Sequence, residues 1–466
     1  MKILHSTTIL RRAACVALLA LPLYALGQGA NAPVDGSGAY KTGVYRNLFA
    51  EASHSEAEID ARIQTAFQQL FHGDPHTQAI YYEAGRNAQG LLAYVTDIAN
   101  RDVRTEGMSY GMMIAVQTNH KAEFDALWNW ANTYMLITDE NNPSVGYFAW
   151  SMHTDGTPNS DSPAPDGEEY FVMSLYFAAH RWGNGHGIYD YQAQADRLLS
   201  TMRHHEQRTG TMPFRLHPQD PPFAPWARAA GNAAPKMPRT STVGPMISEE
   251  HRMILFVPGA GGNEFTDPSY HLPAFYELWA RWGPSEDRAF WSAAAEKSRA
   301  FFSLATNPKT GLVSDYANFD GSPRKSFNPM SANFAEDSWR TVSNWSVDQS
   351  WWGKNPQARV LSDRIQSFLV AEGIHSFANR YMLEGKPLTE RHSAGMVSTT
   401  AVGSLATGKT PQARAFVDEL WATACPSGEQ RYYDGLLYTM SLLHASGRFR
   451  IWMPPAAQLN KRNRSR

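Results

Sequence analysis

The sequence predicts an all-α fold, an (α/α)6 barrel of about twelve helices in a single domain. Apolar residues recur at helical spacing through most of the chain, whereas the alternation typical of strands is almost absent. Antiparallel helices in hairpins close into an inner and an outer ring, with loops at one end forming a cleft. A helical solenoid is the alternative, but the chain has no repeat of fixed period.

The first helix is predicted over about residues 55–71, where apolar residues recur every third or fourth position (Ile59, Ile63, Phe67 and Leu70). Further segments share this pattern, with boundaries defined to within a few residues. They cover about residues 106–119, 121–136, 168–182, 189–204, 271–283, 286–304, 333–352, 357–372, 394–406, 411–423 and 431–446.

Two long segments interrupt the helices. Residues 137–166 are rich in Pro, Gly, Asp and Ser around Gly146-Tyr147-Phe148-Ala149-Trp150, and residues 205–266 hold many Pro and Gly without periodicity. Loops of this length in a compact domain are functional or partly disordered. Neither has the composition of a linker, so we expect residues 33–460 to form one domain, followed by a solvated basic tail, residues 461–466.

The N-terminus has the three parts of a secretory signal peptide, expected to cover residues 1–32. Basic residues precede an apolar segment, residues 13–26, which is too short to span a bilayer comfortably. Ala30-Asn31-Ala32 offers a small-residue cleavage site, with Ala25-Leu26-Gly27 as a second choice. We therefore expect export to the periplasm or the medium, without a membrane anchor.

The composition excludes several classes of function. Of the 466 residues 18% are charged, and the formal net charge of −2 offers none of the clustered Lys and Arg that nucleic-acid binding needs. Because Cys15 lies in the predicted signal, Cys425 alone remains and no intrachain disulfide can form. Aromatic residues make up 12% of the chain. Most are expected in the core, and stacking on sugar rings is one use for the excess.

Glu106 is the first candidate for chemistry. The stretch Asp102–Met113 places this carboxylate between a short polar approach and an apolar helix. Gly107 and Gly111 beside it lower helix propensity, and one reason for small residues here is room for a ligand against the backbone. Glu106 is therefore a candidate acid or base.

Asp166 and Asp337 are the next candidates. Asp166 precedes a helix expected to begin near Gly167, so capping of that helix is the competing interpretation. Asp337 and Arg340 are three residues apart and can share a helix face. Either they form a surface ion pair of little energetic value, or the arginine orients an ionised carboxylate for use as a general base.

Asp315, in a turn-rich loop, is the reserve candidate for the base. Other chemistries lack their motifs: there is no HExxH, CxxC, GxSxG or phosphate-binding GxxxxGK[ST]. We therefore expect neither a metal nor another cofactor. Dispersed carboxylates among Trp and Tyr favour cleavage of glycosidic bonds, which requires an acid and a base on either side of the bond.

At these residues the chain resembles glycoside hydrolase family 8. The motifs Arg104-Thr105-Glu106-Gly107, Pro165–Phe171 and Asp337-Ser338-Trp339-Arg340 occur in the family's order. The resemblance spans nearly the whole mature chain, from Tyr45-Arg46-Asn47-Leu48 to Arg431-Tyr432-Tyr433-Asp434. It implies an (α/α)6 barrel and hydrolysis with inversion of the anomeric centre.

The resemblance also implies roles for single residues. Glu106 matches the general acid that protonates the leaving oxygen, and Asp337 matches the general base that activates water, with Arg340 as its partner. Asp166 matches a third acidic residue that positions the sugar beside the cleavage point. Trp150 matches an aromatic residue that stacks on that sugar.

Within the family, the likeness is to xylan-active members, especially those that release xylose from the reducing end of oligosaccharides. Glu106–Met113, which includes Tyr110 as an expected substrate contact, and Asp267–Pro273 carry this likeness. Those enzymes block the cleft with a loop bearing His, which makes His392 the candidate blocker here; an ordinary surface His is the alternative.

The flanking residues Arg391 and Ser393 depart from the Leu and Pro of that group. An altered loop would leave the cleft open and give an endo-1,4-β-xylanase. From another class, a non-catalytic oligosaccharide-binding protein would keep the barrel without needing all three acidic residues.

Overall fold

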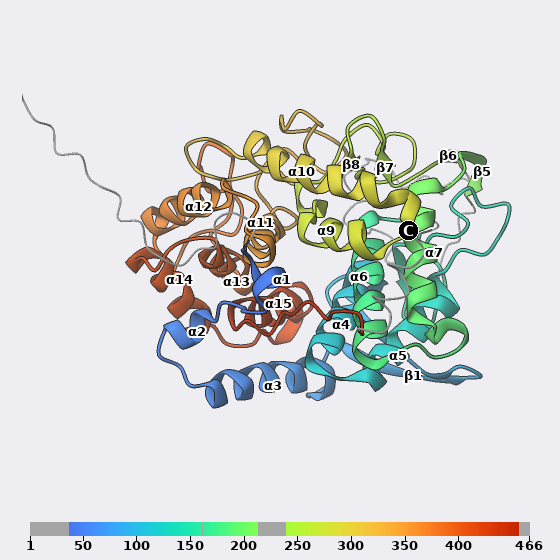
Figure 1. Cartoon of the computed structure of the whole chain (residues 1–466), viewed down its shortest axis with the longest axis horizontal. Helices are drawn as coiled ribbons and strands as arrows, with labels where there is room; N and C mark the ends of the chain where they lie inside the picture. The colour runs from blue at the N-terminus through green and yellow to red at the C-terminus, as the bar shows by residue number, and fades with distance from the viewer. Residues whose placement is uncertain (1–36, 161, 213–238, 456–466) are drawn as a thin grey trace, which may run out of the picture.

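The computed structural model describes residues 37–160, 162–212 and 239–455 (Figure 1). The predicted signal peptide, residues 1–32, and the predicted basic tail, residues 461–466, lie outside the described residues. No helix in the described ranges combines the length and the apolar character that crossing a membrane requires.

Each of the expected helices is present within the described residues. They are α3 (Glu56–His72), α4 (Thr105–Thr118), α5 (Lys121–Trp130), α6 (Pro165–Trp182), α7 (Tyr191–His204), α9 (Pro273–Trp282), α10 (Arg288–Ala305), α11 (Trp339–Trp352), α12 (Ala358–Glu372), α13 (Ala394–Val402), α14 (Pro411–Ala422) and α15 (Tyr433–Ala445). Two short helices, α1 (Ala39–Thr42) and α2 (Leu48–Glu51), precede them.

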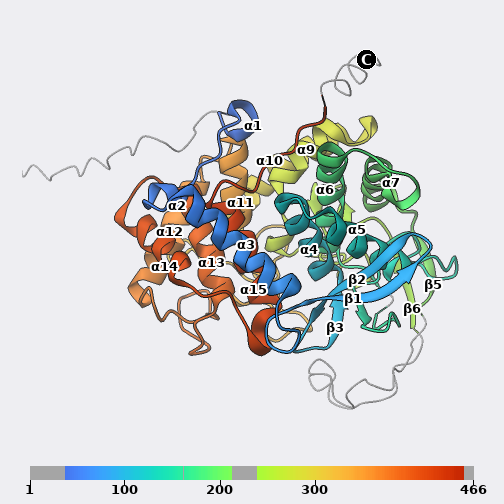
Figure 2. The same cartoon turned by 90° about the horizontal axis from the view of Figure 1, so that it is seen from below.

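The helices form two rings, which confirms the predicted (α/α)6 barrel. In the inner ring α4, α6, α9, α11, α13 and α15 are buried nearly all round; in α13 every residue after Ala394 is buried. Outer helices such as α3 bury one stripe, which begins with Ile59 and Ile63. Each outer helix packs on the inner helix next to it in sequence, except that α3 packs on α15 and closes the ring (Figures 1 and 2).

The expectation of almost no strand is wrong. An antiparallel sheet contains β1 (Tyr81–Asn87), β2 (Gly90–Asp97), β3 (Asp102–Arg104) and β4 (Ser151–His153) in that order. Two small hairpins pair β5 (Arg208–Met212) with β6 (Arg239–Val243) and β7 (Ile247–Ser248) with β8 (Met253–Ile254). Six of these strands have five residues or fewer, and the longer β1 is largely polar and exposed, so tertiary pairing rather than periodicity defines them. Because β3 leads directly into α4, the sheet fixes where that helix begins.

Small residues allow the inner helices to approach each other near their N-termini. A Cβ atom at Gly167 would lie 2.3 Å from Cβ of Thr105. One at Gly107 would lie 2.6 Å from Cε2 of Tyr432, and one at Gly111 would lie 3.0 Å from Leu127. The expectation that Gly107 and Gly111 leave room for a ligand is therefore wrong, because protein side chains occupy that space.

We expect Gly167→Ala to destabilise the protein. The new methyl group would overlap the short, β-branched side chain of Thr105, which cannot turn away, so the cost of overpacking, about 1–3 kcal/mol, exceeds the gain in helix propensity, about 1 kcal/mol. Thermal unfolding measures the difference. Gly244→Ala is the control, because nothing lies within 4 Å of a Cβ atom there. Equal melting temperatures for the two variants would contradict this account of the α4–α6 contact.

Candidate active site

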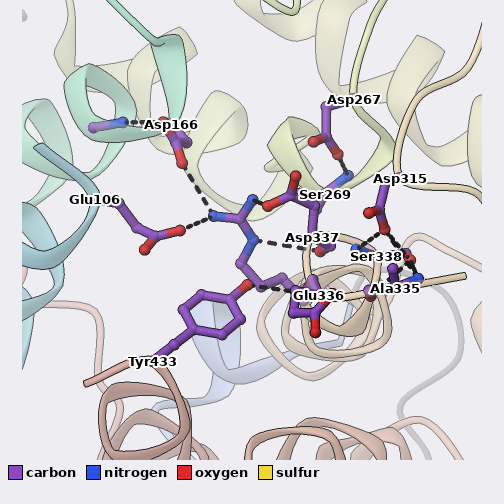
Figure 3. Close-up of polar contacts among 12 residues, drawn as sticks. Glu106, Asp166, Asp267, Ser269, Asp315, Ala335, Glu336, Asp337, Ser338 and Tyr433 are labelled. Carbon is purple, nitrogen blue, oxygen red and sulfur yellow. Dashed lines mark hydrogen bonds and ion pairs between the residues drawn. The ribbon is translucent and has the colours of Figure 1, made fainter. Parts of the chain in front are cut away.

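The candidate residues converge at the N-terminal ends of the inner helices. Glu106 lies in the first turn of α4, Asp166 in the first turn of α6 and Arg340 in the first turn of α11. Asp337 precedes α11 by two residues. Figure 3 shows Glu106, Asp166 and Asp337 around one centre, approached from three different elements. Residues far apart in the sequence therefore form a single polar cluster.

Arg340 joins the three carboxylates. Its Nη1 donates to Glu106 Oε2 at 3.0 Å and to Asp166 Oδ2 at 3.1 Å. Its Nη2 donates to Asp337 Oδ1 at 3.0 Å. The guanidinium is a rigid fork that remains charged at all ordinary pH values. It therefore fixes the three carboxylates relative to one another.

The pairing of Asp337 with Arg340 is present, but it is not a surface ion pair. The Arg340 side chain is only 4% exposed, whereas Asp337 is 31% exposed. Burial raises the pKa of Asp337, and the adjacent positive charge of Arg340 opposes that rise. A carboxylate that is partly exposed and held by an arginine can accept a proton from water, as a general base must.

The alternative interpretation of Asp166, that it caps the following helix, is wrong. The helix begins at Pro165, and the capping position belongs to Ala164, whose side chain makes no cap. Asp166 Oδ1 instead accepts the backbone N–H of Gly167 at 2.9 Å. Its other oxygen is free to receive Arg340. The carboxylate is thus directed into the polar cluster.

Asp315, the reserve base, accepts three hydrogen bonds on one of its carboxylate oxygens. Its Oδ1 accepts from the Ser338 hydroxyl at 2.6 Å and from the backbone N–H groups of Ser338 and Ala335 at 3.1 Å each. Burial raises the pKa of Asp315 well above its ordinary value. Asp315 therefore secures the segment that carries Asp337, as Figure 3 shows, and is poorly placed to act on water itself.

Glu106 has the properties of a proton donor. Burial, opposed by Arg340 and assisted by the negative charge of Asp166, raises the pKa of Glu106 to about 7. The side chain is 14% exposed, and its Oε1 accepts a hydrogen bond from the Tyr432 hydroxyl at 3.1 Å. Although a helix N-terminus favours the anion, desolvation is the larger influence. A pKa near 7 keeps Glu106 protonated at acidic pH, where it can donate a proton.

The two predicted aromatic contacts lie beside this cluster. The Tyr110 hydroxyl accepts a hydrogen bond from Arg340 Nη1 at 3.2 Å. The Trp150 carbonyl accepts the N–H of Thr105, the residue before Glu106, at 3.0 Å. The Trp150 ring lies 5.6 Å from the Arg104 guanidinium and is half-buried.

His392 does not lie among the carboxylates. Its Nδ1 is 2.9 Å from the carbonyl oxygen of Phe377, its Nε2 is 3.7 Å from Glu419, and its ring packs edge-on against Phe377. In the same loop Arg391 pairs with Asp434, next to Tyr433. The side chain of His392 is thus held by the loop and by α14, and its blocking role stays a prediction.

Sequence reasoning missed several neighbours of the cluster. Tyr432 contacts Glu106, and the Tyr433 hydroxyl donates to the carbonyl of Glu336 at 2.9 Å. The ring of Tyr270 lies 5.6 Å from the Arg340 guanidinium. Asp267 is buried, and desolvation raises its pKa well above the ordinary value. Their position in the sequence could have indicated these residues, because Tyr432, like Asp337, lies just before an inner helix.

An inverting site holds its acid and base about 6.5–9.5 Å apart so that water and sugar fit between them. Glu106 can supply a proton and Asp337 can accept one. The barrel and this pair of carboxylates together define the class of the protein, a glycoside hydrolase.

Known proteins identify the particular family. Residues 89–214 and 245–447 match the family described as Glycosyl hydrolases family 8. The chain belongs to this family.

Its relatives match over most of their length. A reducing end xylose-releasing exo-oligoxylanase of Halalkalibacterium halodurans is 41% identical over 422 residues, 90% of this chain and 97% of that protein. The crystal structure of a GH8 xylobiose complex from Teredinibacter turnerae is 48% identical with a TM-score of 0.82, covering 90% of this chain and all of that one. A xylohexaose complex of a catalytic mutant xylanase from the same organism is 47% identical with a TM-score of 0.81, at the same coverage.

We expect Asp166→Asn to move the pH profile to lower pH. If Glu106 donates a proton, kcat/KM falls as the pH rises through its pKa of about 7. The negative charge of Asp166 raises that pKa, so its removal favours the Glu106 anion and lowers the pKa. The residual kcat/KM of the variant, measured across pH, reports the shift.

Asp320→Asn is the matched control, because Asp320 is an exposed turn residue that bonds to Ser322. It should leave the profile unchanged. If the fall of kcat/KM at high pH stays at the same pH in Asp166→Asn, or moves to higher pH, the electrostatic coupling of Glu106 to Asp166 is contradicted.

Proposed function

We propose that the protein hydrolyses β-1,4-xylosidic bonds with inversion and releases xylose from the reducing end of xylo-oligosaccharides. The observation that carries this proposal is the joint contact of Glu106 and Asp337 with the Arg340 guanidinium. It brings a carboxyl group with a raised pKa and a second, more exposed carboxylate to one guanidinium, which supports their assignment as the acid and the base of an inverting reaction. The substrate class rests on the relatives, three of which are exo-oligoxylanases at 36–41% identity.

In the proposed reaction Glu106 protonates the glycosidic oxygen as the bond to the anomeric carbon breaks. Asp337 removes a proton from water, which attacks that carbon from the opposite face. Asp166 accepts hydrogen bonds from the sugar beside the cleavage point, and Trp150 stacks on it. Arg340 holds the carboxylates in place and, as positive charge develops on the sugar ring, keeps Asp337 directed toward the water.

An endo-1,4-β-xylanase is the second candidate. His392 contacts Phe377 and Glu419, and the flanking Arg391 and Ser393 differ from the Leu and Pro of the exo-acting group, which supports an open cleft. The chain is also 47% identical to a xylanase of known structure. Both candidates use the same acid and base and differ only in where along the oligosaccharide the bond is cut.

We expect the purified protein to cleave xylotriose and to release the new reducing end as the α-anomer, because attack opposite the leaving group inverts the β-linkage. Proton NMR of the first products measures the anomer. Glu106→Gln should lower kcat by about 10²–10⁴-fold through loss of general acid catalysis, while Glu83→Gln, on the exposed part of β1, should not. Intact xylotriose with folded wild-type protein would sink the proposal. Undiminished hydrolysis by Glu106→Gln would remove Glu106 from its role.

The same assay on longer substrates separates the two candidates. Early release of xylose from xylohexaose indicates action at the reducing end. Early appearance of mixed oligomers from polymeric xylan indicates an endo-xylanase.

We further propose that the protein is exported, to the periplasm or the medium. The basic, apolar and small-residue parts of residues 1–32 support this. N-terminal sequencing of the mature protein from its native host should begin at Pro33, or at Gln28 for the second cleavage choice. A mature chain that retains Met1 would contradict export by this route.

A further inference from the structure

Phe327 is an unusually exposed aromatic side chain. It is 72% exposed, whereas Tyr134, the next most exposed aromatic residue in the described part of the chain, is 36% exposed. Single exposed apolar residues are common on protein surfaces. The position of Phe327 relative to the candidate active site sets it apart.

A series of aromatic rings leads from Phe327 to the carboxylate cluster. The Phe327 ring centroid lies 5.9 Å from those of Phe256 and Tyr316. Phe256 lies 6.0 Å from Tyr270, and Tyr270 lies 5.6 Å from the Arg340 guanidinium. Phe327 is the exposed end of this series, and the rings beneath it are buried.

The loop that carries Phe327 is fastened to the segment beneath it. Arg324 N–H donates to the Tyr316 carbonyl at 2.9 Å, and Tyr316 N–H donates to the Ser331 carbonyl at 2.8 Å. Ser326 N–H donates to the Ser331 hydroxyl at 3.0 Å. These bonds lie on both sides of Phe327, so its ring is supported in a defined place.

This loop is connected to the proposed base as well. Tyr316 follows Asp315, whose Oδ1 accepts hydrogen bonds from Ala335 and Ser338 on the two sides of Asp337. The loop of Phe327 is therefore joined, through Tyr316 and Asp315, to the segment that carries Asp337.

We propose that Phe327 forms an outer sugar-binding subsite, on which a pyranose unit away from the scissile bond stacks. The inference rests on the proposed function for the identity of the sugar. A pyranose ring presents an apolar C–H face, and covering an exposed phenyl ring with such a face removes apolar surface of both partners from water. A substrate long enough to reach Phe327 gains this contact, and a short one does not.

The experiment compares kcat/KM for xylohexaose and xylotriose in four variants. Phe327→Ala should lower the ratio of the two values by about five- to tenfold, which corresponds to loss of one buried aromatic contact. Phe327→Leu, which stays apolar but loses the flat ring, should also lower it, whereas Phe327→Trp should preserve it. Val44→Ala is the matched control, because Val44 is also 72% exposed and adjoins Tyr45, which contacts Ile451 beyond the far end of α15.

An unchanged ratio in Phe327→Ala, or equal ratios in the Ala and Trp variants, would overturn the subsite. Titration calorimetry in the Glu106→Gln background keeps this test separate from the proposed function. There, Phe327→Ala should weaken binding of xylohexaose or cellohexaose more than binding of the corresponding trisaccharide. Wild-type protein that cleaves no xylo-oligosaccharide would end the proposed function, while the calorimetric comparison would still decide the subsite.

Discussion

The site depends on the buried guanidinium of Arg340. It donates hydrogen bonds of 3.0–3.1 Å to three carboxylates from three different segments, and its side chain is 4% exposed. A buried charge of either sign is costly unless it is paired and hydrogen-bonded. Each member of the cluster therefore requires the others, which explains how three acidic side chains can lie so close together beneath the surface. A buried arginine also fixes directions, because its N–H groups donate to oxygen atoms that lie near the plane of the guanidinium.

The barrel provides the places from which these side chains reach Arg340. Helices α4, α6 and α11 all present their N-terminal turns to the same end, and glycines at the contacts let neighbouring segments approach. Gly167 admits Thr105, Gly107 admits Tyr432 and Gly395 admits Asp434. The sheet adds a second constraint, because the pairing of Arg104 with Ser151 places the Trp150 segment beside the start of α4. Packing of small residues and strand pairing thus determine the dimensions of the chemical site.

Opposing influences act on Glu106, and their magnitudes decide its state. Arg340 and the N-terminus of α4 favour the anion, whereas burial and Asp166 favour the neutral acid. The outcome is a pKa near 7 in place of 4.5, which corresponds to about 3 kcal/mol in favour of the neutral form. Asp337, more exposed and bound by the other nitrogen of Arg340, experiences less burial. One arginine therefore serves two carboxylates whose different environments suit them to different roles.

The helices could be predicted from the amino-acid sequence, because a 3.6-residue apolar period is a local property that survives in the folded chain. The same holds for the Asp337–Arg340 pair, since three-residue spacing joins them on one turn. The contacts of Arg340 with Glu106 and Asp166, 234 and 174 positions away, depend on how the barrel folds. The strands, the packing of Tyr432 against Gly107 and the contact of His392 with Phe377 also appear only in the folded structure. Such contacts join segments distant in sequence, and no local pattern encodes which side chain will occupy a given gap.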